Sequence, residues 1–338
     1  MSFLLASAAR ATVGARSGQE DYFRLWPSEG VLRPLPEQDG LLAVLADGMG
    51  GHTGGAIASQ TACTTFAEAF AASAAPYDER LQSALQQSNE ALARAVAKNA
   101  ALRGMGCTLL AVWIDVSGMR WTSVGDSLLL LYRYPEVIRL NADHSLGSLL
   151  DEQARQNIIT PREAKAHLNR HALRSALTGA TIELIDLHGE PLKVRGGDWI
   201  VLASDGICSL AGDEMANIMG RHRHESPEAM AEGLIAAVLA KRVAGQDNAT
   251  VVVVRIEDGS VPFDERITRA IVRPAESGSR RVGARNAGRL EGAATGRGAR
   301  RSPLGFMPDV RAVVWLGAAA GLLVAAVAIF LWLRPGAG

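Results

Sequence analysis

Residues 41–59 read LLAVLADGMGGHTGGAIAS. The uninterrupted apolar run 41–46 predicts a fully buried strand, and a helix rich in alanine is expected to begin near Gly55. Between the two elements stands Asp47, which is followed directly by a turn rich in glycine. Glycine lets the backbone approach a ligand closely, so this pattern can aim a rigidly held carboxylate at a metal ion. A turn that only closes the strand would have the same sequence, and the rest of the chain must decide between the two.

The composition is that of a folded protein with an uneven distribution of charge. The 338 residues are 48% hydrophobic and 21% charged, which is typical of globular chains and allows one large domain or two ordinary ones. The formal net charge of zero gives no reason to expect nucleic-acid binding. Residues 1–261 carry 23 Lys and Arg against 30 Asp and Glu, whereas residues 262–311 carry 11 against 5. An acidic body followed by a basic segment predicts two parts with different roles.

The cysteines and the N-terminus both indicate a reducing compartment. Cys63, Cys107 and Cys208 lie among apolar or small residues and form no C-x-x-C pair. Buried thiols are therefore expected, rather than a disulfide framework or a zinc site. The first 14 residues have no basic segment and no sustained apolar run, so no signal peptide is expected.

The periodicity of the chain predicts strands and helices in pairs. Such grouping favours an α+β protein over a regular βαβ alternation. Residues 107–134 form short apolar runs broken by Gly-containing turns, which is typical of an antiparallel meander. The expected helices are 57–72, 78–102 and 226–242, with a polar, helix-prone segment at 143–175, and further strands are expected at 182–187, 199–203 and 249–256.

The C-terminal part has the pattern of a linker followed by a membrane span. Arg, Gly, Ala and Ser dominate residues 277–302, which predicts a flexible linker. Residues 313–333 contain no charge and as a helix would be about 31 Å long, enough to cross a bilayer. More arginines precede this segment than follow it, which places the N-terminal body in the cytoplasm. The predicted division is a domain at 1–260, a linker at 261–311, a transmembrane helix at 312–334 and a short tail at 335–338.

Carboxylates recur at the ends of predicted strands, as Asp47 does. No His or Cys accompanies them at metal-ligand spacing, and oxygen ligands alone favour Mg²⁺ or Mn²⁺ over zinc. Two such ions can hold a hydroxide and clamp a phosphoryl group for in-line attack. Without cations this much negative charge would repel itself. The segments are Glu20-Asp21, Asp47-Gly48, Gly125-Asp126, Asp205-Gly206 and Asp247-Asn248.

The order and spacing of these segments resemble the metal-dependent Ser/Thr protein phosphatases of type 2C. Bacterial members read R-x-x-N-E-D, D-G-M-G-G-H, G-T-T, V-G-D-S-R, D-H-S, L-T-x-A-L-G, S-D-G and D-N. The resemblance covers about residues 1–257. The corresponding segments here are Arg16-Ser17-Gly18-Gln19-Glu20-Asp21, Asp47-Gly48-Met49-Gly50-Gly51-His52, Gly106-Cys107-Thr108, Val124-Gly125-Asp126-Ser127, Asp143-His144-Ser145, Leu177-Thr178, Ser204-Asp205-Gly206 and Asp247-Asn248.

The resemblance implies a fold and a set of site residues. The fold would be a four-layer α-β-β-α sandwich of two antiparallel sheets flanked by helix pairs, with the metals at one edge between the sheets. Residues 143–175 would form a mobile flap that selects substrate. By position, the resemblance implies that Asp47, Asp205 and Asp247 are metal ligands, together with the backbone carbonyl of Gly48. Asp21 would act mainly through water, and Asp126 would help to hold a third, weaker metal. Arg16 would bind the phosphate, and the residues around the site would be Glu20, His52 and Asn248.

Several positions depart from the family pattern, but none of them is a metal ligand. Gln19 replaces Asn, Cys107 replaces a small hydroxyl residue, and Leu128 replaces Arg. Residues 177–180 lack the L-T-x-A-L-G form. Met49 stands where eukaryotic members carry a histidine that is a candidate general acid. His52 is close in sequence, and water bound to the metals is an alternative proton source, so this role stays open.

The resemblance implies a phosphatase that hydrolyses phosphoserine and phosphothreonine with two, or with Asp126 three, Mn²⁺ or Mg²⁺ ions, and the charge-free segment 313–333 predicts that it is tethered to a membrane. A metal-bridging hydroxide would attack directly, and Arg16, Asp47, Asp205 and Asp247 would form the catalytic set. The catalytic domain would be a monomer on the cytoplasmic face of the inner membrane, anchored by a single span and opposed by a Ser/Thr kinase. Two alternatives are a non-catalytic member that binds phosphoproteins and a phosphatase for a small phosphorylated metabolite. The basic linker would serve as a tether in partial contact with anionic headgroups.

Overall fold

The computed structural model describes residues 3–27, 33–34 and 40–258. The predicted linker, transmembrane helix and tail at 261–338 lie outside these residues. Across the part of the chain that is described, no helix combines the length and the hydropathy that a membrane span needs.

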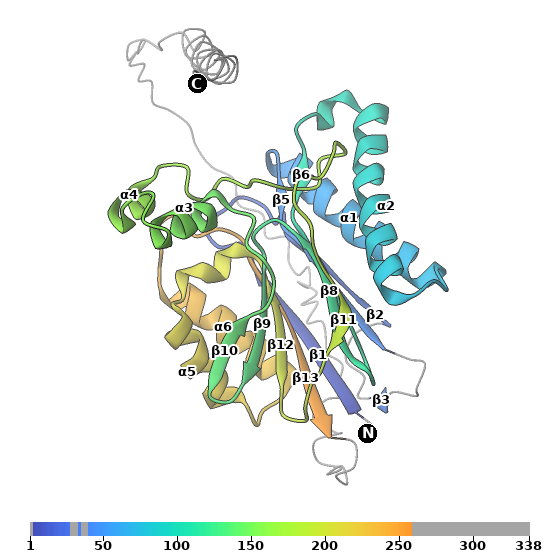
Figure 1. Cartoon of the computed structure of the whole chain (residues 1–338), viewed down its shortest axis with the longest axis vertical. Helices are drawn as coiled ribbons and strands as arrows, with labels where there is room; N and C mark the ends of the chain where they lie inside the picture. Colours follow the sequence, from blue (N-terminus) through green and yellow to red (C-terminus); the bar gives the residue numbers. More distant parts are fainter. Residues whose placement is uncertain (1–2, 28–32, 35–39, 259–338) are drawn as a thin grey trace, which may run out of the picture. The chain divides into compact units, whose positions relative to one another are not determined.

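Two antiparallel sheets carry the fold (Figure 1). The first has six strands in the order β10-β9-β12-β13-β1-β3, and the second has five in the order β11-β8-β7-β4-β2. A third, two-stranded pairing joins β5 to β6. The strands are β1 (Phe3–Thr12), β2 (Tyr22–Trp26), β3 (Arg33–Pro34), β4 (Leu41–Ala46), β5 (Gly48–Met49), β6 (Gly106–Cys107), β7 (Leu109–Asp115), β8 (Gly118–Val124), β9 (Leu128–Arg133), β10 (Glu136–Arg139), β11 (Asp186–Leu192), β12 (Trp199–Ala203) and β13 (Ala249–Asp258).

Helix pairs cover the outer faces of the two sheets, α1 and α2 on one side and α5 and α6 on the other (Figure 1). One apolar cluster lies between the sheets, and each helix pair packs its own cluster against the sheet that it covers. The predicted pair of antiparallel sheets flanked by helices is therefore confirmed. The helices are α1 (His52–Ala72), α2 (Tyr77–Lys98), α3 (Leu146–Arg155), α4 (Pro161–Ala166), α5 (Gly212–His222) and α6 (Pro227–Ala240), with short 3₁₀ turns η1 (Ala100–Leu102) and η2 (Asp205–Ser209).

Strand β4 is buried on both faces, which explains its unbroken apolar sequence. Ala43 and Leu45 face the cluster between the sheets, whereas Leu42 and Val44 face helices α1 and α2. Successive side chains of a strand point to opposite faces, so a strand inside a sandwich needs apolar residues at every position. Strand β12 follows the same rule, with Ile200 and Leu202 on one face and Trp199, Val201 and Ala203 on the other.

Glycine allows the backbone to crowd together directly after these two strands. A Cβ atom at Gly48 would lie 2.1 Å from the carbonyl oxygen of Gly55, and one at Gly206 would lie 2.0 Å from the carbonyl oxygen of Asn248. Both distances exclude any other residue without a backbone shift. The first turn of α1 therefore packs against the backbone next to Asp47. In the same way, Asn248, the residue before β13, packs against the backbone next to Asp205.

Some elements differ from the sequence prediction. Helix α1 begins at His52, ahead of the start predicted at positions 55–57, and α5 and β10 were not predicted. The strand predicted at 182–187 is found at Asp186–Leu192. Cys63 and Cys107 are buried as expected, but the prediction was wrong for Cys208, which is exposed because it lies on the short turn η2 at the protein surface.

Candidate metal-binding active site

Five aspartates from different elements meet at one end of the two sheets. Asp47 follows β4, Asp205 begins η2 with only Ser204 between it and β12, and Asp247 comes two residues before β13. Asp21 immediately precedes β2, and Asp126 lies in the turn between β8 and β9. The other four carboxylates all act electrostatically on Asp47, which shows that chain segments far apart in sequence converge here.

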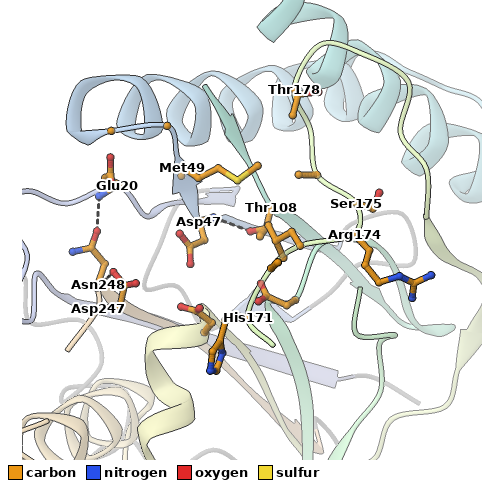
Figure 2. Close-up of a pocket in the computed structure, with 18 of the residues that line it drawn as sticks. Glu20, Asp47, Met49, Thr108, His171, Arg174, Ser175, Thr178, Asp247 and Asn248 are labelled. Carbon is orange, nitrogen blue, oxygen red and sulfur yellow. Dashed lines mark hydrogen bonds between the residues drawn. The ribbon is translucent and has the colours of Figure 1, made fainter. Parts of the chain in front are cut away.

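A cavity of about 710 Å³ opens at this point, between the carboxylates and the segment 171–183. Figure 2 shows Asp47 and Asp247 around this cavity, with His171 below them and Arg174 on the opposite side. Of the sequence-predicted site residues, Arg16, Glu20, Asp47, Gly48, Asp126, Asp205, Asp247 and Asn248 line it. Asp21 is not among the lining residues, because it is buried behind them and accepts a hydrogen bond from Ser204 Oγ at 2.8 Å.

Burial and mutual repulsion disfavour the charged form of these carboxylates. Burial raises the pKa of Asp126 to about 7, with the charge of Asp205 adding to the shift. Burial also raises the pKa of Asp21 to about 6, partly offset by the hydrogen bond from Ser204. The pKa of Asp47 is raised well above its ordinary value by burial and then by its acidic neighbours, and burial and Asp247 raise the pKa of Asp205. A group of carboxylates with this property is well suited to receive cations.

Buried oxygen atoms without a hydrogen-bond partner also indicate that this group of carboxylates receives cations. Glu20 Oε1, Asp21 Oδ1 and Asp205 Oδ1 are buried and have no hydrogen-bond partner. Buried polar atoms without a partner are rare in proteins, and an ion or a water is a common explanation. The donor set is entirely oxygen, which suits Mg²⁺ or Mn²⁺.

Within residues 3–27, 33–34 and 40–258, no three His, Cys, Asp or Glu side chains are already grouped closely enough to hold one ion. Hard cations often keep several waters and use backbone carbonyls beside one or two carboxylates. The residues present therefore fit a site completed by water and by the Gly48 carbonyl, rather than an all-protein cage.

Thr108 fixes the backbone of Asp47, a role that the sequence reasoning missed. Its hydroxyl accepts a hydrogen bond from Asp47 N at 2.9 Å, as Figure 2 shows, and its own N–H donates to Asp47 O at 2.9 Å. The hydroxyl also lies 2.8 Å from Ser127 Oγ. The segment Gly106-Cys107-Thr108 belonged to the motif series, so the signal was present, but its role required the pairing geometry.

Asn248 ties the loop that carries Arg16 to the loop that carries Asp247. Its side-chain amide donates to Val13 O at 2.9 Å and to Gly18 O at 3.0 Å, and its oxygen accepts from Glu20 N at 2.7 Å (Figure 2). Its own N–H donates to Asp247 Oδ1 at 2.8 Å. The two loops are thus held in one arrangement at the edge of the cavity.

Arg16 reaches the carboxylate group directly, with its Nη2 donating to Asp247 Oδ2 at 2.6 Å. Both side chains are about half exposed, at 48% and 41%, so the pair can exchange with solvent or ligand at little cost. A guanidinium in this place is available to a phosphate at the cavity edge once Asp247 takes another partner.

Two further predictions concern His52 and the flap at 143–175. His52 begins α1, but its side chain lies outside what the structure describes. The cavity wall formed by the predicted flap is the segment 171–183, which extends beyond the predicted segment 143–175. His171 and Arg174 belong to this wall and were not singled out by sequence, because the contact depends on how the flap packs against the sheets.

The metal-free protein should lose stability as the pH rises through neutrality. Asp21 and Asp126 have folded-state pKa values of about 6 and 7, above the ordinary value of 3.8, so the folded protein binds more protons than the unfolded chain. Their contribution to stability is therefore complete below about pH 4 and is lost as the pH rises through 6 and 7. Thermal unfolding with EDTA from pH 5 to 8 should show a falling melting temperature, and Mn²⁺ should raise it most at pH 8. A metal-free melting temperature that is constant or rises over this range would contradict the carboxylate cluster.

A family model described as Protein phosphatase 2C matches residues 34–234. The serine/threonine protein phosphatase PstP of Mycobacterium tuberculosis is 32% identical over 244 residues, or 70% of this chain and 44% of PstP. The protein phosphatase PhpP of Streptococcus pneumoniae is 30% identical over 223 residues, or 64% of this chain and 86% of PhpP. The chain thus spans less than half the length of PstP and most of the length of PhpP.

A solved structure shares the fold. The catalytic domain of PstP, crystallised in complex with two manganese ions, matches with a TM-score of 0.60 and 28% identity, covering 76% of this chain and 100% of that chain.

Proposed function

This chain belongs to the protein phosphatase 2C family, as its motif order predicted, and we propose that it is a metal-dependent phosphatase of phosphoserine and phosphothreonine in proteins. The observation that carries this proposal is the group of buried aspartates with raised pKa values beside an arginine at one cavity. Hydrolysis of a phosphothreonine peptide by metal-free and Mn²⁺-loaded protein tests it.

The residues proposed to hold two Mn²⁺ or Mg²⁺ ions come from both sheets. They are Asp47, the Gly48 carbonyl, Asp205 and Asp247, with Asp21 acting through water and Asp126 helping to hold a third ion. The manganese ions bound by PstP support this assignment. When bound, such cations supply an activated water for in-line attack on phosphorus and neutralise charge on the phosphoryl group.

The chain's own groups would orient the substrate. We propose that Arg16 leaves Asp247 and donates two hydrogen bonds to the phosphate, since a guanidinium matches two phosphate oxygens in one plane. Asn248 keeps the loop of Arg16 in register with the loop of Asp247, and Thr108 keeps Asp47 in place. Met49 lines the same cavity, but its thioether has no proton to give to the leaving group.

The membrane anchor and the division of the chain remain proposals that rest on sequence. We propose a catalytic domain at 1–260, a basic linker at 261–311, a transmembrane helix at 312–334 and a tail at 335–338. The domain would lie in the cytoplasm and act on phosphoproteins produced by an opposing Ser/Thr kinase. The charge-free segment 313–333 and the arginines before it support this arrangement.

A chain ended after residue 261 should stay active and leave the membrane fraction. The described catalytic residues all precede this point, whereas the proposed anchor follows it. Fractionation of cells that express either chain, followed by phosphatase assay of each fraction, measures both properties. If the shortened chain remains in the membrane fraction, the anchor proposal is wrong.

A further inference from the structure

Arg174 is an arginine in the wall of the catalytic cavity. It is exposed and lines the cavity wall. Among the residues that the structure describes, its guanidinium makes no hydrogen bond and no ion pair. Arg16, the other arginine of this cavity, is held by Asp247 at 2.6 Å. An exposed guanidinium on the wall of a binding cavity is suited to take an anionic group from a ligand.

The backbone around Arg174 is held firmly, so the point from which its side chain extends is fixed. Arg174 N donates to His144 O at 2.8 Å. The next residue, Ser175, is buried, and its hydroxyl donates to Leu184 O at 2.8 Å and accepts from Leu184 N at 2.9 Å. Leu177 and Cys107 exchange two backbone hydrogen bonds of 2.9 and 3.0 Å. When a ligand binds, only the side chain of Arg174 has to be ordered, because the backbone that carries it is already in place.

Arg174 lies on the opposite side of the cavity from the carboxylates. Figure 2 shows it across from Asp47 and Asp247, the side on which Arg16 contacts Asp247. The cavity volume of about 710 Å³ is within the range of whole ligand pockets and leaves room for residues that flank the phosphorylated one. The anion that reaches Arg174 would therefore be a neighbour of the phosphate in the substrate, rather than the phosphate itself.

We propose that Arg174 selects phosphoprotein substrates that carry an acidic residue beside the phosphorylated serine or threonine. This inference rests on the proposed function, because it names the substrate class of the same cavity. Glu183 lines the same wall and, in the described part of the chain, forms no ion pair with Arg174. It should therefore weaken the preference, and E183Q should strengthen it.

The test uses the full chain with Mn²⁺ and three phosphothreonine peptides that differ only in whether Asp, Ala or Lys flanks the phosphothreonine. The kcat/KM values should fall in the order Asp, Ala, Lys, with about 1.5- to 5-fold between neighbours, as expected for an exposed ion pair. R174E should reverse the order. R162E makes the same charge change on α4 of the flap, away from the cavity lining, and should leave the order unchanged.

The same peptides carrying a non-hydrolysable phosphonate, with binding measured by fluorescence anisotropy, give the order without turnover. If none of the peptides is hydrolysed but the phosphonates bind in the predicted order, the proposed function fails and the role of Arg174 stands. If wild-type protein shows no preference in binding or turnover, if R174E keeps the wild-type order, or if R162E changes it as much as R174E, the inference is overturned.

Discussion

Asp47→Asn is expected to reduce phosphatase activity by more than the roughly 10- to 100-fold that loss of a group supporting a metal ligand costs. The substitution keeps the shape of the side chain but removes a charge from the centre of the carboxylate group. Because burial and four acidic neighbours already disfavour that charge, the metal-free variant should be at least as stable as wild-type protein at pH 8. Activity with a phosphothreonine peptide and thermal unfolding in EDTA measure the two effects.

The combination of lost activity and kept stability separates a metal-binding role from a structural one. Asp213→Asn is the matched control, since Asp213 is an exposed acid in the first turn of α5, and it should change neither property by much. A D47N variant that keeps more than a tenth of wild-type activity would contradict the assignment of Asp47, and so would one that loses activity only because it unfolds.

Arg16→Ala is expected to lower kcat/KM by about 100-fold or more, the usual cost of removing one donor that stabilises charge in the transition state. The affinity of the variant for Mn²⁺ should not fall. In wild-type protein the Arg16 guanidinium lies 2.6 Å from Asp247, and its removal leaves the Asp247 carboxylate free to bind the metal ion. Steady-state kinetics and calorimetric titration with Mn²⁺ in phosphate-free buffer measure these two quantities.

Arg16→Lys serves as the control for geometry. Lysine keeps the charge but cannot donate two parallel hydrogen bonds to one phosphate, so its kcat/KM should lie between those of wild-type protein and R16A. If R16A binds Mn²⁺ much more weakly than wild-type protein, the contact with Asp247 supports the metal site, and the assignment of Arg16 to phosphate alone is wrong.

The buried strands were predictable because their environment is uniform. β4 and β12 face apolar clusters on both sides, so their sequences are continuous apolar runs, and the aspartate that follows each run marks the end of the strand. The positions of Asp47 and Asp205 could therefore be placed at strand ends before the structure was known. That they lie at the same cavity follows from the sheet order, which periodicity does not contain.

The elements that the sequence misplaced or missed are those whose environment is mixed. β11 (Asp186–Leu192) contains Gly189 and Pro191, pairs only with β8 at the edge of its sheet, and has an irregularity between His188 and Leu192. An edge strand needs no strict alternation, so its pattern was weak. α5 was missed although Asp213 and Glu214 stand in its first turn, a helix-start signal that a short element makes easy to overlook.

The cavity wall could not be predicted for a different reason. His171 and Arg174 reach the cavity because segment 171–183 is pinned to β6 through Leu177 and to α2 through Asn89, which accepts from Thr178 N and Gly179 N. These contacts join residues roughly 70 to 90 positions apart in the chain. Local pattern contains no information on such pairings.

Metal dependence of phosphothreonine hydrolysis tests the central claim most directly. Full-length protein is stripped with EDTA, dialysed, and assayed on a phosphothreonine peptide before and after addition of Mn²⁺ or Mg²⁺. We predict no measurable hydrolysis without metal and recovery of activity with Mn²⁺ in wild-type protein but not in Asp205→Asn. Hydrolysis that persists in EDTA, or that Asp205→Asn retains at the wild-type rate, would contradict the assignment of the aspartate cluster as the metal-binding active site.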